Sequence, residues 1–184
     1  ESQEGGYAAC SDYNVTDVFT GRPMRTYFRD KQVHITSAVV YALWKYERWT
    51  GDGSLWLSGG AAVAVEAARF YHSLLTRRVE SDVYELRDVI GPDEYHERVD
   101  NNLYTNEMAR FTLRTAVSVC ERLRREHPQA YAALEAELRF EGELPAFAEA
   151  AEKLKRHAPR ADGVLEQFDG YFALEDASVD AVRA

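Results

Sequence analysis

Apolar residues recur every three or four positions over much of the chain, which is the spacing that one face of an α-helix requires. The first such segment has a clear apolar stripe, formed by Ile35, Val39, Leu43 and Tyr46, and a Gly-Asp-Gly sequence ends it. Prolines mark the boundaries of the later segments. The pattern predicts helices over residues 32–50, 103–126, 129–138 and 145–157.

A further helix is expected after the first one, with Ser54 as its N-cap and its end near Val79. Gly59 and Gly60, which alanines follow, would permit close contact with a neighbouring helix. The side chains expected to face the core are Leu57, Val63, Ala67, Phe70, Leu74 and Leu75.

Two segments have the character of strands. Residues 83–89 alternate between apolar and polar side chains, as a half-buried strand does, and lead directly into Gly91-Pro92. Residues 164–174 are rich in aromatic side chains and are expected to be strand-like or extended. No period of about 34 residues recurs, which counts against a helical repeat array. Paired helices joined by functional loops fit a helical toroid or bundle.

The composition is that of a globular protein. Of the 184 residues, 46% are hydrophobic, and 22 basic against 31 acidic residues give a formal net charge of −9. This charge opposes attraction to nucleic acid or to an anionic membrane surface. No apolar run reaches the ~20 residues of a membrane span, and the first residues lack the charged and apolar regions of a secretory signal. We therefore expect a cytoplasmic protein without nucleic-acid or membrane partners.

The cysteines, Cys10 and Cys120, are too few for a disulfide framework. Cys120 lies within the apolar pattern of a predicted helix. It is therefore predicted to be a buried free thiol, with a disulfide or a nucleophilic role as the alternatives.

Chemically active side chains are concentrated in the acidic loop, residues 88–97, which reads Asp-Val-Ile-Gly-Pro-Asp-Glu-Tyr-His-Glu. Gly91-Pro92 interrupts helix and strand and presents Asp93 and Glu94 from a turn. An acidic loop is most often a solvated or capping segment, and that interpretation stays open for Asp93. Glu94 is the stronger candidate, because its proline, tyrosine and histidine neighbours could desolvate or orient its carboxyl group.

Apolar contact favours the protonated form of a carboxyl group, which a general acid needs near neutral pH. Glycosidic bond cleavage is the chemistry that most often uses such a group, since the leaving oxygen must be protonated as it departs. Side-chain amides that follow the loop could bind the hydroxyl groups of a sugar. Glu94 is therefore predicted to donate a proton to a polar substrate.

Other kinds of site are open alternatives. Asp93, His96 and Glu97 could ligate a metal ion, although no Cys or His pair has the spacing of a zinc site. The chain has neither the Gly-x-Ser-x-Gly sequence of a serine hydrolase nor a Gly-x-x-x-x-Gly-Lys phosphate loop. His34 opens the first predicted helix, and the residues alone leave it either structural or part of a site.

At these residues the chain resembles glycoside hydrolase family 65, the inverting α-glucoside phosphorylases that include the maltose, trehalose and kojibiose enzymes. The resemblance covers nearly the whole chain, and the Gly-Pro-Asp-Glu-Tyr-His block at 91–96 is highly specific. It rests on Gly21-Arg22-Pro23, His34-Ile35-Thr36, residues 38–46, Thr50-Gly51-Asp52, Ala68-Arg69-Phe70, and residues 88–97, 101–106 and 168–176.

The resemblance implies an all-α fold in which residues 1–184 form the middle part of one (α/α)6-barrel catalytic domain, with short strand-like segments carrying the active-site loop. Glu94 matches the family's general acid, which protonates the glycosidic oxygen while inorganic phosphate attacks the anomeric carbon from the opposite face. The products are β-glucose 1-phosphate and the released acceptor. The expected substrate-binding residues are Asp93, His96, Asn101, Asn102 and His34.

The partners implied are a disaccharide and inorganic phosphate as co-substrate, with no metal and no other cofactor. A homo-oligomer is expected, because three or four helix pairs cannot close a six-pair toroid and leave apolar surface exposed. The family's phosphate-binding segment is expected after Ala184 and much of its glucose subsite before Glu1, so the chain alone should be inactive. Family members often carry a Tyr-Pro-Trp type stretch near the start, where this chain reads Tyr7-Ala8-Ala9-Cys10-Ser11, which puts the usual donor preference in question.

Two other functions are open. A hydrolase of the same family would use water activated by a carboxylate outside this segment. A non-catalytic helical interaction module would leave Glu94 without a chemical role.

Overall fold

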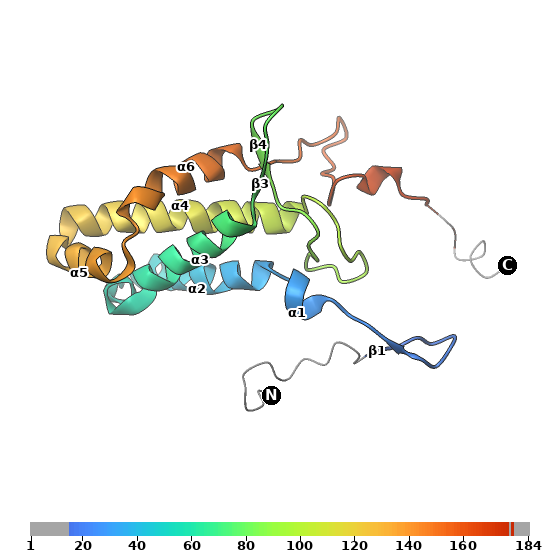
Figure 1. Cartoon of the computed structure of the whole chain (residues 1–184), viewed down its shortest axis with the longest axis horizontal. Coiled ribbons are helices and arrows are strands. Elements are labelled where there is room, and N and C mark those ends of the chain that lie inside the picture. The colour runs from blue at the N-terminus through green and yellow to red at the C-terminus, as the bar shows by residue number, and fades with distance from the viewer. Residues whose placement is uncertain (1–14, 177, 179–184) are drawn as a thin grey trace.

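The centre of the fold is α4 (Leu103–Glu126), which contacts α2 (His34–Thr50), α3 (Ala61–Leu74), α5 (Pro128–Leu138) and α6 (Leu144–Lys153). The computed structural model describes residues 15–176 and 178, so the segment from Tyr7 to Ser11 lies outside the described residues. Figure 1 shows these helices as an elongated bundle. None of the described helices is long and apolar enough to cross a membrane.

The helix predicted over residues 103–126 is confirmed with the same bounds. Asn102 is its N-cap, and its side-chain oxygen accepts a hydrogen bond of 3.0 Å from the backbone N–H of Thr105. Leu113, Ala116 and Cys120 are fully buried on its inner face. Cys120 is the buried free thiol that its position predicted, and burial raises the pKa of that thiol to about 12.

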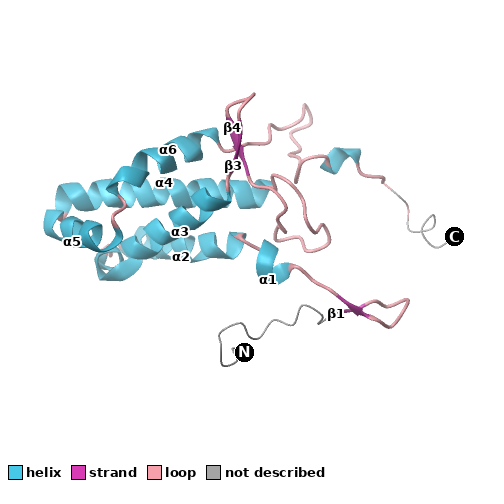
Figure 2. Ribbon diagram, viewed as in Figure 1, coloured by secondary structure: helices cyan, strands magenta, loops and turns pink. Residues whose placement is uncertain are grey.

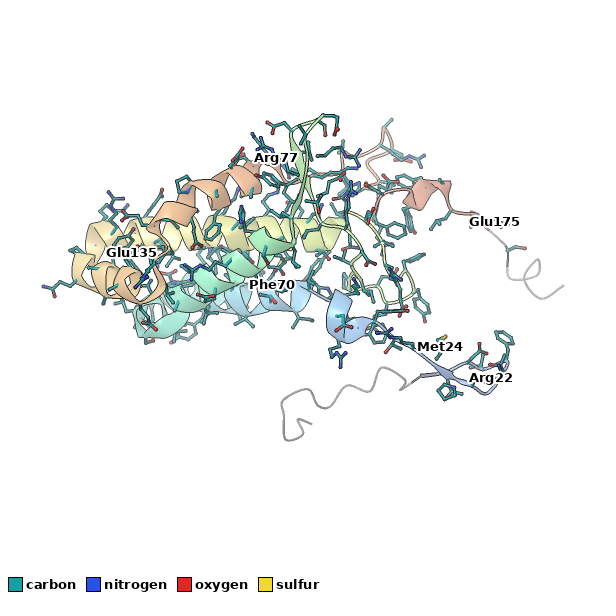
Figure 3. The ribbon with its side chains drawn as sticks, viewed as in Figure 1. Arg22, Met24, Phe70, Arg77, Glu135 and Glu175 are labelled. Atoms are coloured by element: carbon teal, nitrogen blue, oxygen red, sulfur yellow. The ribbon has the colours of Figure 1, made fainter. Side chains whose placement is uncertain are left out.

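The other long helices have ends close to those predicted. α2 begins at His34, because a short helix, α1 (Phe28–Lys31), precedes it and Gln32 is the C-cap of α1. Gly51 ends α2 with a φ of 74°, in the left-handed region that glycine adopts without strain. α6 ends at Lys153 and not at His157. Glu135 of α5 accepts bonds of 2.9 Å from the N–H groups of Phe140 and Glu141, where a 3-10 turn (Glu141–Glu143) leads into α6 (Figure 3).

The prediction of one helix from Ser54 to Val79 is close at its start, since helical structure begins at Ser54, but it is wrong at its end and it missed a kink at Ser58 and Gly59. A π-helical turn, Trp56–Gly60, precedes α3, and its N-cap is Leu55, which offers no side-chain hydrogen bond. α3 stops at Leu74, because β3 (Thr76–Arg78) pairs with β4 (Val83–Glu85) as an antiparallel hairpin. Pairing with a strand further along the chain therefore overrides the local helical pattern.

The predicted core face of α3 is wrong except for Ala67, which is 6% exposed, and Leu75, which is partly buried and packs against the core. Val63 and Phe70 are 41% and 37% exposed, and Leu57 and Leu74 are also exposed (Phe70 is labelled in Figure 3). Small side chains let two helix backbones approach closely, so the alanine-rich face packs inward and the larger residues point outward. The buried residues of α3 are Ala61, Ala64, Val65, Ala67, Ala68 and Tyr71.

The strands are short and form two hairpins, one of β1 (Val15–Thr16) with β2 (Pro23–Met24) and one of β3 with β4. The strand predicted over residues 83–89 is thus limited to its first three residues. Arg77 of β3 binds Asp82 of the same hairpin at 3.0 Å (Figure 3).

Residues 164–174, which were expected to be strand-like or extended, form an irregular segment that ends in a 3-10 turn, Tyr171–Ala173. The backbone N–H of Asp169 donates to the carbonyl of Asp100 at 3.0 Å, and the carbonyl of Gln167 accepts from the N–H of Leu103 at 2.8 Å. These two bonds join the segment to the chain that follows the acidic loop.

Candidate active site

The acidic loop lies at one end of the bundle between β4 and α4, where Figure 2 shows neither helix nor strand. Three contacts tie it to the junction of α1 and α2. The backbone N–H of Ile90 donates to the carbonyl of Lys31 at 2.9 Å, and the ammonium of Lys31 binds Asp88 at 2.6 Å. The amide nitrogen of Gln32 donates to Oε1 of Glu94 at 2.6 Å. The loop is thus anchored to residues about 60 positions earlier.

Asp93 anchors the other side of the loop. Its carboxylate accepts hydrogen bonds from Nδ1 of His96 at 2.7 Å, from the side chain of Gln167 at 2.9 Å and from the backbone N–H of Tyr95 at 3.0 Å. These bonds, that of His96 first, lower the pKa of Asp93 to about 2. Asp93 is therefore ionised at every physiological pH.

His96 links the loop to the aromatic residues of the 164–174 segment. Its ring centroid lies 5.1 Å from that of Phe168 and 6.0 Å from that of Tyr171. These contacts and the bond to Asp93 fix the orientation of the imidazole. The structure therefore pairs His96 with Asp93 and not with Glu94.

The structure does not show the desolvation of Glu94 that its proline, tyrosine and histidine neighbours could have provided. Glu94 is exposed, and Tyr95 is 96% exposed and does not cover it. Oε1 of Glu94 accepts from Gln32, and within the described residues Oε2 has no hydrogen-bond partner. One oxygen of this exposed carboxyl group is therefore held by the protein, whereas the other is not held by any described residue.

His34 lies beneath the loop, with its side chain buried. Its Nδ1 is 3.2 Å from the carbonyl oxygen of Ile90, and its ring meets that of Tyr104 edge-on at 5.7 Å. Burial lowers the pKa of His34, against the opposing effects of the Ile90 carbonyl and the nearby charge of Glu94. A neutral imidazole that donates from Nδ1 to a carbonyl leaves Nε2 as a hydrogen-bond acceptor.

Asn101 and Asn102 are buried and bonded to the protein. Asn101 has a φ of 53°, and its side chain accepts from the backbone N–H of Leu86 at 3.2 Å and donates to Asp169 at 2.8 Å. Asn102 caps α4, and a Cβ on Gly91 would lie only 2.3 Å from its Nδ2. Both amides therefore hold the loop, and contact with a sugar stays a prediction for them.

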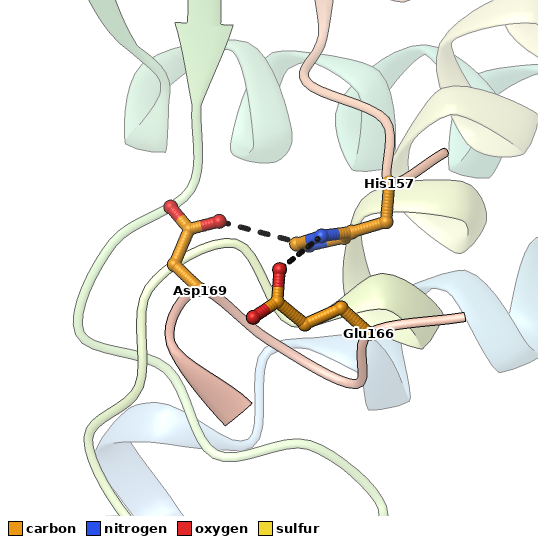
Figure 4. Close-up of side chains that lie close together, drawn as sticks. All are labelled: His157, Glu166 and Asp169. Atoms are coloured by element: carbon orange, nitrogen blue, oxygen red, sulfur yellow. Dashed lines mark ion pairs between the residues drawn. The ribbon is translucent and has the colours of Figure 1, made fainter. Parts of the chain in front are cut away.

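A further group of titratable residues lies behind the loop (Figure 4). His157, Glu166 and Asp169 place possible ligand atoms within 4.8 Å of one another, and among the described residues this is the group that could hold a metal ion. Nε2 of His157 donates to the carbonyl of Asn101 at 2.6 Å, and the ammonium of Lys155 binds Asp169 at 2.8 Å. That ammonium already neutralises Asp169, which disfavours a second cation there. Asp93, His96 and Glu97, the alternative metal site, do not converge in this way.

Sequence reasoning missed Lys31, Gln32 and Gln167 as parts of the site. Gln32 lies two positions before His34, and Gln167 directly precedes Phe168, which belongs to the segment that carries the family resemblance. Neither glutamine stands out by type, because an amide is common on any surface. Their proximity to resemblance-bearing segments was the only available signal.

Comparison with known proteins identifies the family. The model of the glycosyl hydrolase family 65 central catalytic domain matches residues 9–184. The chain belongs to glycoside hydrolase family 65. The resemblance found in the sequence is thereby confirmed.

Among curated relatives of this family-65 chain, a nigerose phosphorylase of Lachnoclostridium phytofermentans is 50% identical over 100% of the chain and 25% of its own length. A kojibiose phosphorylase of Thermoanaerobacter brockii is 35% identical over 88% of the chain and 21% of its own length. The chain thus spans about a quarter of the relatives that it matches.

A solved structure, described as a kojibiose phosphorylase from human microbiome, has a TM-score of 0.72 and 20% identity over 87% of this family-65 chain and 24% of its own. At this identity the likeness shows the fold alone. Together with the family match it confirms the predicted all-α fold, in which the helices are part of an (α/α)6 barrel.

Proposed function

We propose that residues 1–184 are the central part of the catalytic domain of an inverting α-glucoside phosphorylase. The family match and the names of the relatives, which include nigerose, kojibiose and trehalose phosphorylases, support this reaction class. Within the proposed reaction, Glu94 is the general acid and inorganic phosphate is the nucleophile.

The observation that carries the proposal is the contrast between two adjacent acids. Asp93 accepts three hydrogen bonds and has a pKa of about 2, so it has no proton to donate near neutral pH. Glu94 has one oxygen held by Gln32 and the other without a partner among the described residues. Of the pair, Glu94 is therefore the residue suited to proton donation.

The proposed step conserves atoms and charge. Oε2 of Glu94 transfers its proton to the glycosidic oxygen as the bond from that oxygen to the anomeric carbon breaks. An oxygen of phosphate forms the new bond on the opposite face, so an α-glucoside gives β-glucose 1-phosphate. The acceptor sugar leaves with the proton. Because phosphate is the nucleophile, the reaction needs no second carboxylate as a base.

The remaining site residues are proposed as supports. The Asp93–His96 pair braces the turn that carries Glu94, and Asn101 and Asn102 hold the end of the loop. His34 presents a neutral imidazole beside Glu94. Direct contact of any of them with a sugar hydroxyl is part of the proposal and follows from the family resemblance.

The test is Glu94→Gln in the full-length polypeptide, with Glu80→Gln, an exposed residue of the β3–β4 turn, as the matched control. General acid catalysis contributes about 10²–10⁴-fold, so phosphorolysis of an unactivated disaccharide should fall by that factor in the first variant only. Nigerose is the substrate to test first, since the 50% identical relative is named for it. Unchanged turnover in Glu94→Gln would favour a non-catalytic module.

The products separate the phosphorylase from the related hydrolase. A phosphorylase forms β-glucose 1-phosphate at a rate that depends on phosphate concentration. Free glucose, released at the same rate with and without phosphate, would assign the chain to a hydrolase and refute the proposed nucleophile.

A further inference from the structure

The contact between Gln32 and Glu94 joins residues 62 positions apart, and it is the hydrogen bond that fixes Glu94 within the described residues. The side chain of Gln32 is partly buried, whereas Glu94 is exposed. The nitrogen lies 2.6 Å from Oε1 of Glu94, a short distance for an amide donor and a carboxylate acceptor. A partly buried donor therefore holds one oxygen of an otherwise open acid.

The backbone around Gln32 is itself fixed. Its N–H donates to the carbonyl of Phe28 at 3.0 Å and closes α1, and its carbonyl accepts from the N–H of Ile35 at 3.4 Å in the first turn of α2. The adjacent Lys31 binds the acidic loop through both its carbonyl and its ammonium. The backbone of Gln32 is therefore held in place, and its side chain ties the acid to the helix junction.

An amide nitrogen can donate a hydrogen bond but cannot accept one. The oxygen of Glu94 that faces Gln32 must therefore act as the acceptor, in the protonated and in the ionised acid alike. Because a carbonyl oxygen accepts more strongly than a hydroxyl oxygen, this bond favours the proton on Oε2, which has no hydrogen-bond partner among the described residues.

We propose that Gln32 is a positioning residue for the general acid: it selects Oε2 as the oxygen that delivers the proton and aims it at the leaving group. This inference rests on the proposed function of Glu94. Gln32 itself touches neither the glycosidic oxygen nor phosphate and acts only through the carboxyl group.

The test compares Gln32→Met, which keeps the length of the side chain and removes the donor, with Gln32→Lys, which keeps a donor. Gln129→Met, at an exposed glutamine of α5, is the matched control. Each variant of the full-length polypeptide is assayed with an unactivated disaccharide and with α-glucosyl fluoride, whose leaving group needs little protonation. Loss of a hydrogen bond to a charged group should lower the rate of the step that depends on it by about 10- to 100-fold.

We expect kcat for the disaccharide to fall about 10- to 100-fold in Gln32→Met, with a much smaller loss for the fluoride. Gln32→Lys should retain more of the disaccharide activity, and KM should change little in either variant. A merely structural role would not produce this dependence on the leaving group.

Equal losses on both substrates, or an unchanged rate on the disaccharide, would overturn the role of Gln32. Glu94→Gln is measured in parallel to keep the two proposals apart. If Glu94→Gln loses disaccharide activity while Gln32→Met does not, only the positioning role fails. If Glu94→Gln keeps full activity, the general acid itself is misassigned and the inference fails with it.

Discussion

Gly91 has no room for a side chain, and this can be tested by a double-mutant cycle with Asn102. A Cβ at position 91 would lie 2.3 Å from Nδ2, 2.7 Å from Cγ and 2.8 Å from Oδ1 of Asn102. All three atoms belong to the side chain that caps α4. Gly91→Ala must therefore push this side chain away or shift the loop.

The cost follows from what Asn102 does. Its Oδ1 accepts from the N–H and from the hydroxyl of Thr105, each at 3.0 Å, and Thr105 is fully buried. Loss of a helix cap costs about 0.5–2 kcal/mol, and leaving buried donors unpaired costs about 1–3 kcal/mol. Because these two costs overlap, we expect Asn102→Ala to lower the free energy of unfolding by about 1–3 kcal/mol, and Gly91→Ala to lower it by a similar amount.

The stability losses of Gly91→Ala and Asn102→Ala should not be additive. In Asn102→Ala the three clashing atoms are absent, so adding Gly91→Ala should cost nearly nothing further. The assay is equilibrium unfolding in urea of the four proteins of the cycle, followed by far-UV circular dichroism. Asn102→Ser, which keeps an uncharged capping oxygen, serves as the control and should cost less than Asn102→Ala.

Amide hydrogen exchange at Thr105 reports directly on the cap, because the capped N–H exchanges only when its hydrogen bond opens. Each 1.4 kcal/mol of lost cap stability should speed this exchange about tenfold. Additive costs in the cycle, or slow exchange at Thr105 in Gly91→Ala, would refute the idea that the two residues compete for one space. The reason for glycine at this position would then have to lie elsewhere than in the cap.

Two further predictions concern protonation and association. The folded pKa of His34 is lowered by burial from 6.5, so the unfolded chain takes up a proton first as pH falls. The free energy of unfolding should therefore decrease below about pH 6.5, and less steeply in His34→Gln than in wild type. Urea unfolding at about pH 7.5 and about pH 5 measures this difference, and equal decreases in the two proteins would contradict the prediction. Ile35, Val39, Val63 and Phe70 are 57%, 51%, 41% and 37% exposed and line a groove of about 690 Å³. We expect the chain alone to self-associate through this face in light scattering and Val39→Lys to weaken the association, whereas a monomer at all concentrations would exclude it.

The sequence predicted α4 with the correct bounds because several local signals agreed. An asparagine precedes the helix, apolar residues recur along it, and arginines occupy its last turn. These signals act within a few residues of one another. No distant partner was needed to interpret them.

α3 was predicted with the wrong face because its segment is apolar nearly all round. Which side of α3 becomes buried depends on how closely α4 can approach it, and the side with small residues allows the closest approach. Val63 and Phe70 have the larger apolar surfaces but lie outside. Hydrophobicity alone could not identify the contact face, since it measures transfer from water and not the fit between two helices.

The candidate site was predicted in part. The acidic loop and its Gly-Pro turn were evident from residue types, and the structure adds what separates Asp93 from Glu94. That difference comes from Gln32 and Gln167, which lie 62 and 74 positions from their carboxylate partners. Local sequence does not encode such contacts, because they arise only when the bundle brings both segments to the same end.

The order in which these anchors are synthesised has a consequence for the nascent chain. Gln32 has already left the ribosome when Glu94 is made, but Gln167 follows Asp93 by 74 residues. At about 5–20 residues per second, translation leaves the loop without this second anchor for about 4–15 s. During this interval Asp93 lacks one of its three hydrogen-bond donors while the preceding helices can already pack. The acidic loop therefore gains its last anchor late in synthesis. A translational pause before position 167 would prolong the time for which Asp93 lacks the bond from Gln167.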